Sequence, residues 1–201
     1  MAIEAPRRNA RRRAILDAAL SVFLERGVSG ASIEEIRQRS GASVGSLYHR
    51  FGSKEGIAAA VYIDALADYQ QAFARALDRD RSTEATIKAV VGEHLRWVQR
   101  NADRAQYLFM GRDADVRLAV RDELRDLNAD FFGRVLAWLR PRIEAHEICD
   151  APVDVLHALW LGPSQELSRH WLAGGRRGRL SPHAALLADA AWRSLAARPA
   201  S

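Results

Sequence analysis

The sequence predicts an all-α protein: a three-helix helix-turn-helix head followed by a larger helical body, about nine helices in total. Alanine, leucine, arginine and glutamate, which favour helices, fill most of the chain, and apolar residues recur at three- and four-residue spacing. Alternating runs of β-branched residues, which would indicate strands, are missing from the sequence. The 201 residues can bury a core, and no apolar run approaches the roughly 20 residues of a membrane span.

The first two helices are predicted from their ends. The first spans about residues 9–26, with an apolar stripe on one side, and stops at Gly27. Ser32, with Glu35 three residues later, predicts a capping box at the start of a short second helix.

The next two helices also begin at serines. Ser43 is expected to cap a short third helix with Val44, Leu47 and Phe51 as its buried side. Ser53 is expected to cap a fourth helix that continues to about residue 77.

Five more helices are expected beyond residue 82. They lie at about 83–100, around 107–109, and at about 115–146, 152–172 and 181–197. Pro141 lies inside the third of these helices and is expected to kink or split it.

The positive charge is concentrated at the N-terminal end. The formal net charge is +5, and residues 1–55 hold ten Arg and Lys but only six Asp and Glu. A basic end on a nearly neutral body suits a polyanion, although a solvated tail would have the same composition. The single cysteine, Cys149, excludes an intramolecular disulfide, and the N-terminus shows no secretory signal, so we expect a cytoplasmic protein.

The second and third helices form a helix-turn-helix pattern with Gly41 in the turn. The third helix carries the small residues Gly45 and Ser46 near its N-terminus, and larger hydrogen-bonding side chains follow them. Such a helix suits the major groove of DNA, where N-terminal residues approach base edges and the surroundings hold phosphates. The helix N-termini at Ser32, Ser43 and Ser53 also offer backbone N–H groups to phosphate.

The stretch ASIEEIRQRSGASVGSLYHRFGSKEGI resembles the DNA-binding head of TetR-family transcriptional regulators, a likeness that covers about residues 10–57. The resemblance implies double-stranded DNA with a pseudo-palindromic operator as the partner. It implies that Val44, Gly45 and Ser46 approach base edges, and that Tyr48 contacts a phosphate or a thymine methyl group. The full set of DNA-binding residues it predicts is Ser32, Ser43, Val44, Gly45, Ser46, Tyr48, His49, Arg50 and Lys54.

Within this set the roles differ. His49 and Arg50 are expected at phosphates or bases, and Ser32 and Lys54 at the DNA backbone on the two flanks. Tyr48 could instead be a core aromatic residue with an exposed hydroxyl, and the side that His49 occupies depends on the helix register. The arginines of residues 7–13 could enter a minor groove, contact phosphates, or form a disordered arm.

A single recognition helix is too small for tight specific binding, so we expect a homodimer. In the TetR family the last two long helices form a four-helix bundle with those of the partner. The corresponding apolar residues are Leu156, Leu159, Trp160, Leu167, Trp171, Leu186, Leu187, Trp192 and Leu195. The alternative is that they only fill the intramolecular core.

Family members usually hold a small-molecule ligand among the middle helices. The candidate lining residues are His94, Trp97, Val98, Tyr107, Met110, Phe131, Trp138, His157, Leu161 and Gln165. Each of them could be plain core instead. An apolar pocket with a few polar groups would take a small, partly hydrophobic effector.

The resulting prediction is a helix-turn-helix DNA-binding domain at residues 1–56 and an effector-binding and dimerisation domain at residues 57–201. The function expected is that of a transcriptional repressor that its effector releases from the operator. No enzymatic activity, metal or cofactor is expected. An effector-independent architectural DNA-binding protein, or an enzyme with an incidental helix-turn-helix, are the alternatives.

Overall fold

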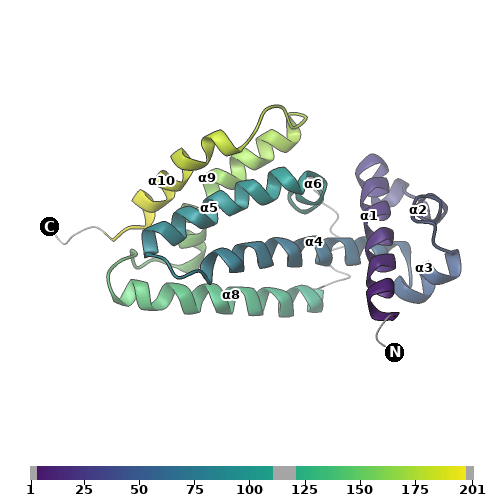
Figure 1. The fold of residues 1–201 in the computed structure, drawn as a ribbon, viewed down its shortest axis with the longest axis horizontal. Coiled ribbons are helices and arrows are strands. Elements are labelled where there is room, and N and C mark those ends of the chain that lie inside the picture. The colour runs from purple at the N-terminus through teal and green to yellow at the C-terminus, as the bar shows by residue number, and fades with distance from the viewer. Residues whose placement is uncertain (1–3, 111–120, 198–201) are drawn as a thin grey trace. The chain divides into compact units, whose positions relative to one another are not determined.

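The computed structural model describes residues 4–110 and 121–197, and these residues form nine α-helices, one short 3-10 helix and no strand (Figure 1). The predicted all-α class is confirmed. The helices are α1 (Glu4–Gly30), α2 (Ile33–Ser40), α3 (Val44–Phe51), α4 (Lys54–Leu77), α5 (Thr83–Arg100), α6 (Ala102–Met110), α8 (Arg121–Glu144), α9 (Val153–Ala173) and α10 (Ala184–Leu195), with the 3-10 helix η1 at Ser181–His183.

The chain divides into two compact units. The first comprises Met1–Leu66 and Asp103–Arg125, and the second comprises Ala67–Ala102 and Asp126–Ser201. This division differs from the boundary expected between residues 56 and 57, because Ile57, Ala58 and Val61 of α4 are buried in the first core. The assignment of DNA binding to 1–56 and of effector binding to 57–201 stays a prediction.

The first unit is built around α1. Ile15, Ala19 and Val22 form its fully buried side, and α2 packs against it (Figure 1). The helix starts earlier than expected, at Glu4 rather than about residue 9, since a proline is tolerated in a first helical turn. Gly27 has φ 70° and ψ 166°, so the predicted stop is a break, after which the helical assignment continues to Gly30.

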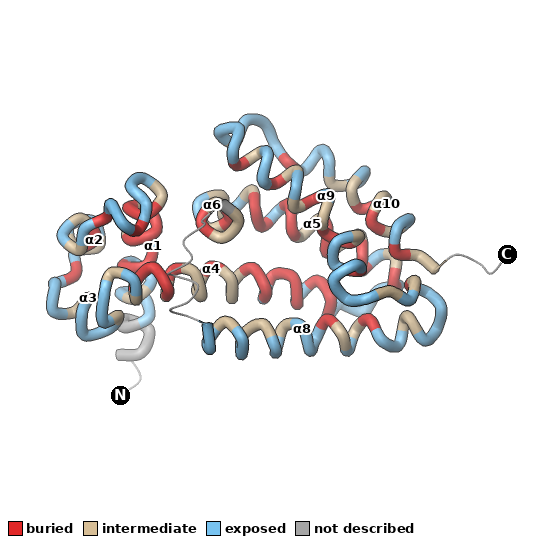
Figure 2. Tube along the Cα trace, turned by 180° about the vertical axis from the view of Figure 1, so that it is seen from behind, coloured by how far each residue is buried: buried red, intermediate tan, exposed pale blue. Residues whose placement is uncertain are grey.

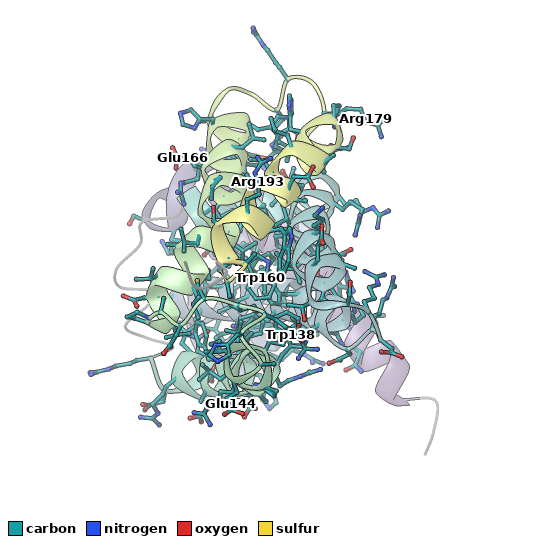
Figure 3. All side chains as sticks on the ribbon, turned by 90° about the vertical axis from the view of Figure 1, so that its left-hand side faces the viewer. Trp138, Glu144, Trp160, Glu166, Arg179 and Arg193 are labelled. Atoms are coloured by element: carbon teal, nitrogen blue, oxygen red, sulfur yellow. The ribbon has the colours of Figure 1, made fainter. Side chains whose placement is uncertain are left out.

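The second unit is built around α5, which packs against both α9 and α10 (Figure 1). Ile87, Val90 and Val91 of α5 are fully buried, and Figure 2 shows buried positions recurring along this helix. The rings of Trp138 and Trp160, labelled in Figure 3, have their centroids 5.5 Å apart in the same core.

Two details of the body correct the predictions. Pro141 does not split its helix, because α8 continues to Glu144. The proline lies in the last turn, where a missing N–H group costs one hydrogen bond close to the natural end of the helix. The last predicted helix begins as the 3-10 turn η1, and α10 itself starts at Ala184. The part of the expected 115–146 helix at 115–120 lies outside the described residues.

Candidate DNA-binding surface and candidate effector site

The start of α2 is fixed by the capping box that the sequence predicts. The backbone N–H of Glu35 donates to Ser32 Oγ at 3.2 Å, and the backbone N–H of Ser32 donates to Glu35 Oε2 at 3.1 Å. The same carboxylate forms an ion pair with Arg26 at 2.6 Å. These contacts satisfy N–H groups that a helix leaves without partners at its first turn.

The turn and the start of α3 also follow the predicted pattern. Gly41 has φ 65° and ψ 12°, the left-handed conformation that favours glycine at this turn. The backbone N–H of Ser46 donates to Ser43 Oγ at 3.2 Å, which caps α3. Leu47 is fully buried in the core that also contains Ile36 and Ala42, so the inner side of α3 packs firmly onto the rest of the head.

The outer side of α3 brings most of the predicted DNA-binding residues together. Val44 and Tyr48 are 39% and 49% exposed, and exposed positions run along this helix in Figure 2. The exposed or half-buried residues of the predicted set on this surface are Ser43, Val44, Gly45, Ser46, Tyr48, His49 and Arg50. The expectation that Val44 belongs to the buried side is wrong, because this residue, at the first position of α3, is left largely exposed.

The arginines of α2 are engaged by carboxylates of their own surroundings. Arg37 donates two hydrogen bonds of 2.7 Å to Glu34, and Arg39 donates to Glu25 at 2.5 and 2.6 Å. The hydrogen bonds from Arg39 and Arg37 lower the pKa of Glu25 and of Glu34, respectively, to about 2. The positive charge of α2 is therefore already balanced within the head.

The N-terminal arginines lie on α1 and not on an extended arm. The helix already includes residues 7–13, which argues against disorder there, although the side chains of Arg7 and Arg8 lie outside the described residues. Arg11 and Arg13 are exposed, whereas Arg12 forms an ion pair with Asp64 at 3.0 Å. A contact of Arg11 or Arg13 with DNA stays a prediction.

Lys54 has partners within the head itself. Its ammonium donates hydrogen bonds of 3.0 Å to the carbonyl oxygens of Ser29 and Ala31. We call these two hydrogen bonds the Lys54 bridge. Because they engage two of the three ammonium N–H groups, at most one remains for a phosphate. The predicted flanking contact of Lys54 with DNA stays a prediction.

The body contains a buried chain of polar groups centred on His94. The Tyr69 hydroxyl lies 2.9 Å from His94 Nδ1, and His94 Nε2 lies 3.1 Å from Ser168 Oγ. The Ser168 hydroxyl donates to the carbonyl oxygen of Ser164 at 2.8 Å. Since its single proton is used there, Ser168 accepts from Nε2–H, and Nδ1 accepts from the Tyr69 hydroxyl. The donor and the acceptor of each of these three hydrogen bonds are thereby defined.

The predicted effector residues fall into separate groups. His94 and Trp97 lie beside Tyr69, and Gln165 hydrogen-bonds to Tyr69, so these three are gathered around one buried tyrosine. His157 Nε2 is 3.5 Å from the Gln165 amide nitrogen at the exposed end of the group. Val98 and Leu161 are fully buried, while Phe131 and Trp138 pack as half-buried rings against the second core.

Two of the predicted effector residues do not join this group. Tyr107 belongs to the first unit, where it stacks on Phe23 with centroids 6.2 Å apart and donates to the carbonyl oxygen of Ala58. Its membership of the effector site stays a prediction. The side chain of Met110 lies outside the described residues.

Sequence reasoning missed Tyr69, Ser164, Ser168 and the pair Gln70 and Asn128. The last two are joined by a hydrogen bond of 2.8 Å from the Gln70 amide to Asn128 Oδ1. The side-chain oxygen Oε1 of Gln70 is buried and has no hydrogen-bond partner among the described residues. The four-residue spacing of Ser164 and Ser168 was a usable signal, because it puts two hydroxyls on one side of a helix otherwise lined there with apolar residues.

Comparison with known proteins agrees with this geometry. Residues 15–61 match the model of the bacterial regulatory proteins of the tetR family. The chain is 36% identical over 83 residues to the HTH-type transcriptional regulator BetI of Cronobacter sakazakii, which covers 40% of this chain and 41% of the relative. It is 34% identical over 88 residues to the HTH-type transcriptional repressor KstR2 of Rhodococcus jostii, which covers 42% of this chain and 41% of the relative.

The sequence match to the tetR family lies in the head, at residues 15–61, and the curated relatives match over about two fifths of this chain. The matched part of the chain spans only about two fifths of the length of these curated relatives.

Similar solved structures cover the body as well as the head. A TetR-family regulator from Marinobacter aquaeolei has a TM-score of 0.78 at 19% identity, over 96% of this chain and 100% of that one. FadR from Bacillus subtilis, solved in complex with stearoyl-CoA, has a TM-score of 0.75 at 15% identity, over 90% of this chain and 98% of that one. At these identities the likeness shows a shared fold.

The predicted dimer residues of the body divide between core and surface. Leu156, Trp160 and Leu195 are at most 3% exposed within the single chain and fill its own core, the alternative that the sequence left open. Leu186 is 67% exposed. The remaining predicted residues are half-buried, namely Leu159, Leu167, Trp171, Leu187 and Trp192.

The described residues were also compared with the needs of a metal site and of a membrane-spanning helix, and they meet neither. Within 4–110 and 121–197 no group of three or more His, Cys, Asp or Glu side chains could hold a metal ion. None of the helices in these ranges combines the length and apolar character needed to cross a membrane.

The buried histidine predicts a pH dependence of stability. Burial lowers the pKa of His94 to about 4, whereas an unfolded histidine titrates near 6.5. Between these values the unfolded state binds more protons, so the free energy of unfolding is highest above pH 6.5 and falls as the pH approaches 4. The loss should reach about 3 kcal/mol at most.

Urea unfolding of the second unit, followed by tryptophan fluorescence at pH 7.5 and pH 5, measures this loss. His94→Gln should reduce the difference between the two pH values, while His183→Gln at an exposed position should leave it unchanged. Equal pH dependence in the wild type and in His94→Gln would contradict the assignment.

Proposed function

We propose that the protein is a DNA-binding transcriptional regulator, a homodimeric repressor that a small, partly hydrophobic effector releases from its operator. The observation that carries this proposal is the exposed side of α3, held rigidly by the caps at Ser32 and Ser43 and by the buried Leu47. A helix presented in this way can enter a major groove without losing its packing. The relatives named as a regulator and a repressor support the direction of the proposal.

We expect a dimer because the surface of α3 that would contact base pairs is small. One eight-residue helix contacts too few base pairs for specific binding, so a second copy is needed, with half-sites about 34–36 Å apart or a multiple of that spacing. Exposed apolar residues on α9 and α10 suit such a partner: Val153 is 42% exposed, Val155 43% and Leu186 67%. A two-fold axis would bring the same residues of both copies together.

We propose that the effector binds beside the buried polar groups of Tyr69, His94 and Ser168. The Gln165 and His157 side chains lead from the surface to Tyr69, and the side-chain oxygen Oε1 of Gln70 offers a buried acceptor in the same unit. Apolar neighbours such as Trp97 and Leu161 would favour a ligand with an apolar part and few polar groups. FadR, a protein of this fold, was solved with stearoyl-CoA, a larger ligand that shares only the apolar part, its acyl chain.

The main test is selection of DNA by the purified protein from a random-sequence library, followed by fluorescence anisotropy with the selected duplex. The proposal expects an inverted repeat, bound with an affinity that falls steeply with salt. Small, partly hydrophobic compounds that raise the melting temperature should then release this duplex. Recovery of no preferred sequence would contradict regulation through an operator, and recovery without release by any compound would favour the architectural alternative.

Gly45→Ala tests the close approach of α3 to DNA. A Cβ at this position meets no atom within 4 Å, so the fold should tolerate it and the helix should gain up to about 1 kcal/mol. Affinity for the selected duplex should nevertheless fall about tenfold, because the methyl group would separate the helix from the groove. Gly30→Ala is the control, since its Cβ would meet only Arg26 Cβ at 3.7 Å. Unchanged DNA affinity of Gly45→Ala would exclude backbone approach at this residue.

A further inference from the structure

The Lys54 bridge joins the two ends of the helix-turn-helix. Lys54 is the first residue of α4, directly after the turn that ends α3, and its two acceptors lie on the chain that enters α2. The segment between acceptors and donor is therefore α2 and α3 themselves. We propose that Lys54 is a positioning residue that supports DNA binding by holding α2 and α3 in place, and not chiefly by contacting a phosphate.

The acceptor at Ala31 matters most. Its carbonyl belongs to the same peptide group as the N–H of Ser32, and that N–H is held by Glu35 Oε2 at 3.1 Å. The peptide group before α2 is thus fixed at its oxygen by Lys54 and at its nitrogen by the capping box. The orientation of α2, against which α3 packs, depends on this group.

The electrostatic setting also favours a bridge. An ammonium group at the start of α4 lies near the positive end of that helix dipole, which is unfavourable by itself. The acceptor carbonyl groups, at the C-terminal end of α1 and directly after it, carry the partial negative charge of a helix C-terminus, and lysine side chains commonly hydrogen-bond such groups. The position of Lys54 is therefore explained by its acceptors on residues 29 and 31.

A bridge and a phosphate contact differ in their salt dependence. Loss of one phosphate contact lowers the slope of log affinity against log salt by about 0.9. Without the bridge, α2 and α3 are less ordered in the free protein and must be ordered when DNA binds, which weakens binding. The complex itself keeps the same phosphate contacts. We therefore expect Lys54→Met, which keeps the aliphatic stem, to lower the affinity about tenfold without changing the salt slope.

The matched control is Arg50→Met, which removes the same charge from the exposed end of α3. It should lower the slope by about 0.9 if Arg50 contacts phosphate. Amide hydrogen exchange of the free protein gives a second measurement that does not depend on DNA. The Ala31, Ser32 and Ile36 amides should exchange about tenfold faster in Lys54→Met and at the wild-type rate in Arg50→Met. Lys54→Arg, which can still donate to both carbonyls, should restore affinity and protection.

A salt slope that falls by about 0.9 in Lys54→Met would overturn the proposal, as would unchanged amide exchange. The exchange measurement stands even if no DNA sequence is selected, so failure of the bridge and failure of the proposed function are distinguishable.

Discussion

Gly56→Ala should destabilise the first unit by about 3 kcal/mol or more. A Cβ on this residue would lie 1.9 Å from the carbonyl oxygen of Phe51 and 3.1 Å from its carbonyl carbon. Both are backbone atoms, so no side chain can turn away to make room. The Phe51 oxygen is held in place because it accepts a hydrogen bond of 2.8 Å from the N–H of Ser53. Gly56 is therefore required by close packing at the junction of α3 and α4.

The effect can be measured separately for the two units, because all five tryptophans lie in the second one. Circular dichroism reports the helices of both units, whereas tryptophan fluorescence reports the second unit alone. In Gly56→Ala the loss of helical signal that belongs to the first unit should therefore occur at a lower temperature, while the fluorescence transition stays unchanged. Gly45→Ala is the matched control, a glycine in the first turn of the preceding helix with free space at its Cβ. Equal stability of the two variants would show that the α3–α4 junction can open without cost.

The parts of the head that sequence could predict are local. The hydroxyl oxygens of Ser32, Ser43 and Ser53 each accept a hydrogen bond from the backbone N–H group three residues later, as their spacing indicates. Gly41 takes the left-handed conformation that its place between two capped helices requires. Such features depend on residues within one helical turn, so a short stretch of sequence contains the necessary information.

The parts that sequence could not predict join distant residues or depend on exact atomic approach. The Lys54 bridge spans 25 and 23 residues, and the hydrogen bond between His94 and Ser168 spans 74. The resemblance suggested a DNA contact for Lys54, but the carbonyl oxygens that engage it are backbone atoms and leave no trace in residue identity. Gly56 is a third example, because only the path of the backbone shows what its missing side chain avoids.

The body shows the same limit for apolar residues. Leucine and tryptophan on two long helices predict burial, but periodicity alone does not tell whether the covering surface belongs to the same chain or to a partner. The structure assigns Trp160 to the core of its own chain: it is 3% exposed, and its indole N–H donates to the carbonyl oxygen of Ile87 at 3.1 Å. Its ring also meets Phe73 edge to face, with the centroids 5.6 Å apart.

Trp160→Ala should accordingly lower the free energy of unfolding of the second unit by about 3–5 kcal/mol, since it removes a large buried ring and leaves the Ile87 carbonyl oxygen without its donor. Leu186→Ala at the exposed position of α10 should change the stability of the single chain by no more than about 0.5 kcal/mol. If α10 contacts a second copy, Leu186→Ala should instead weaken dimerisation about tenfold.

Urea unfolding at several protein concentrations separates these effects, because the stability of a dimer depends on concentration and that of a folded chain does not. Sedimentation velocity then gives the dimer dissociation constant directly. A Trp160→Ala variant that unfolds like the wild type but sediments as a monomer would move Trp160 from the core to the interface. Loss of stability at every concentration, with dimerisation weakened by Leu186→Ala, would place the core at Trp160 and the shared surface on the outer side of α10.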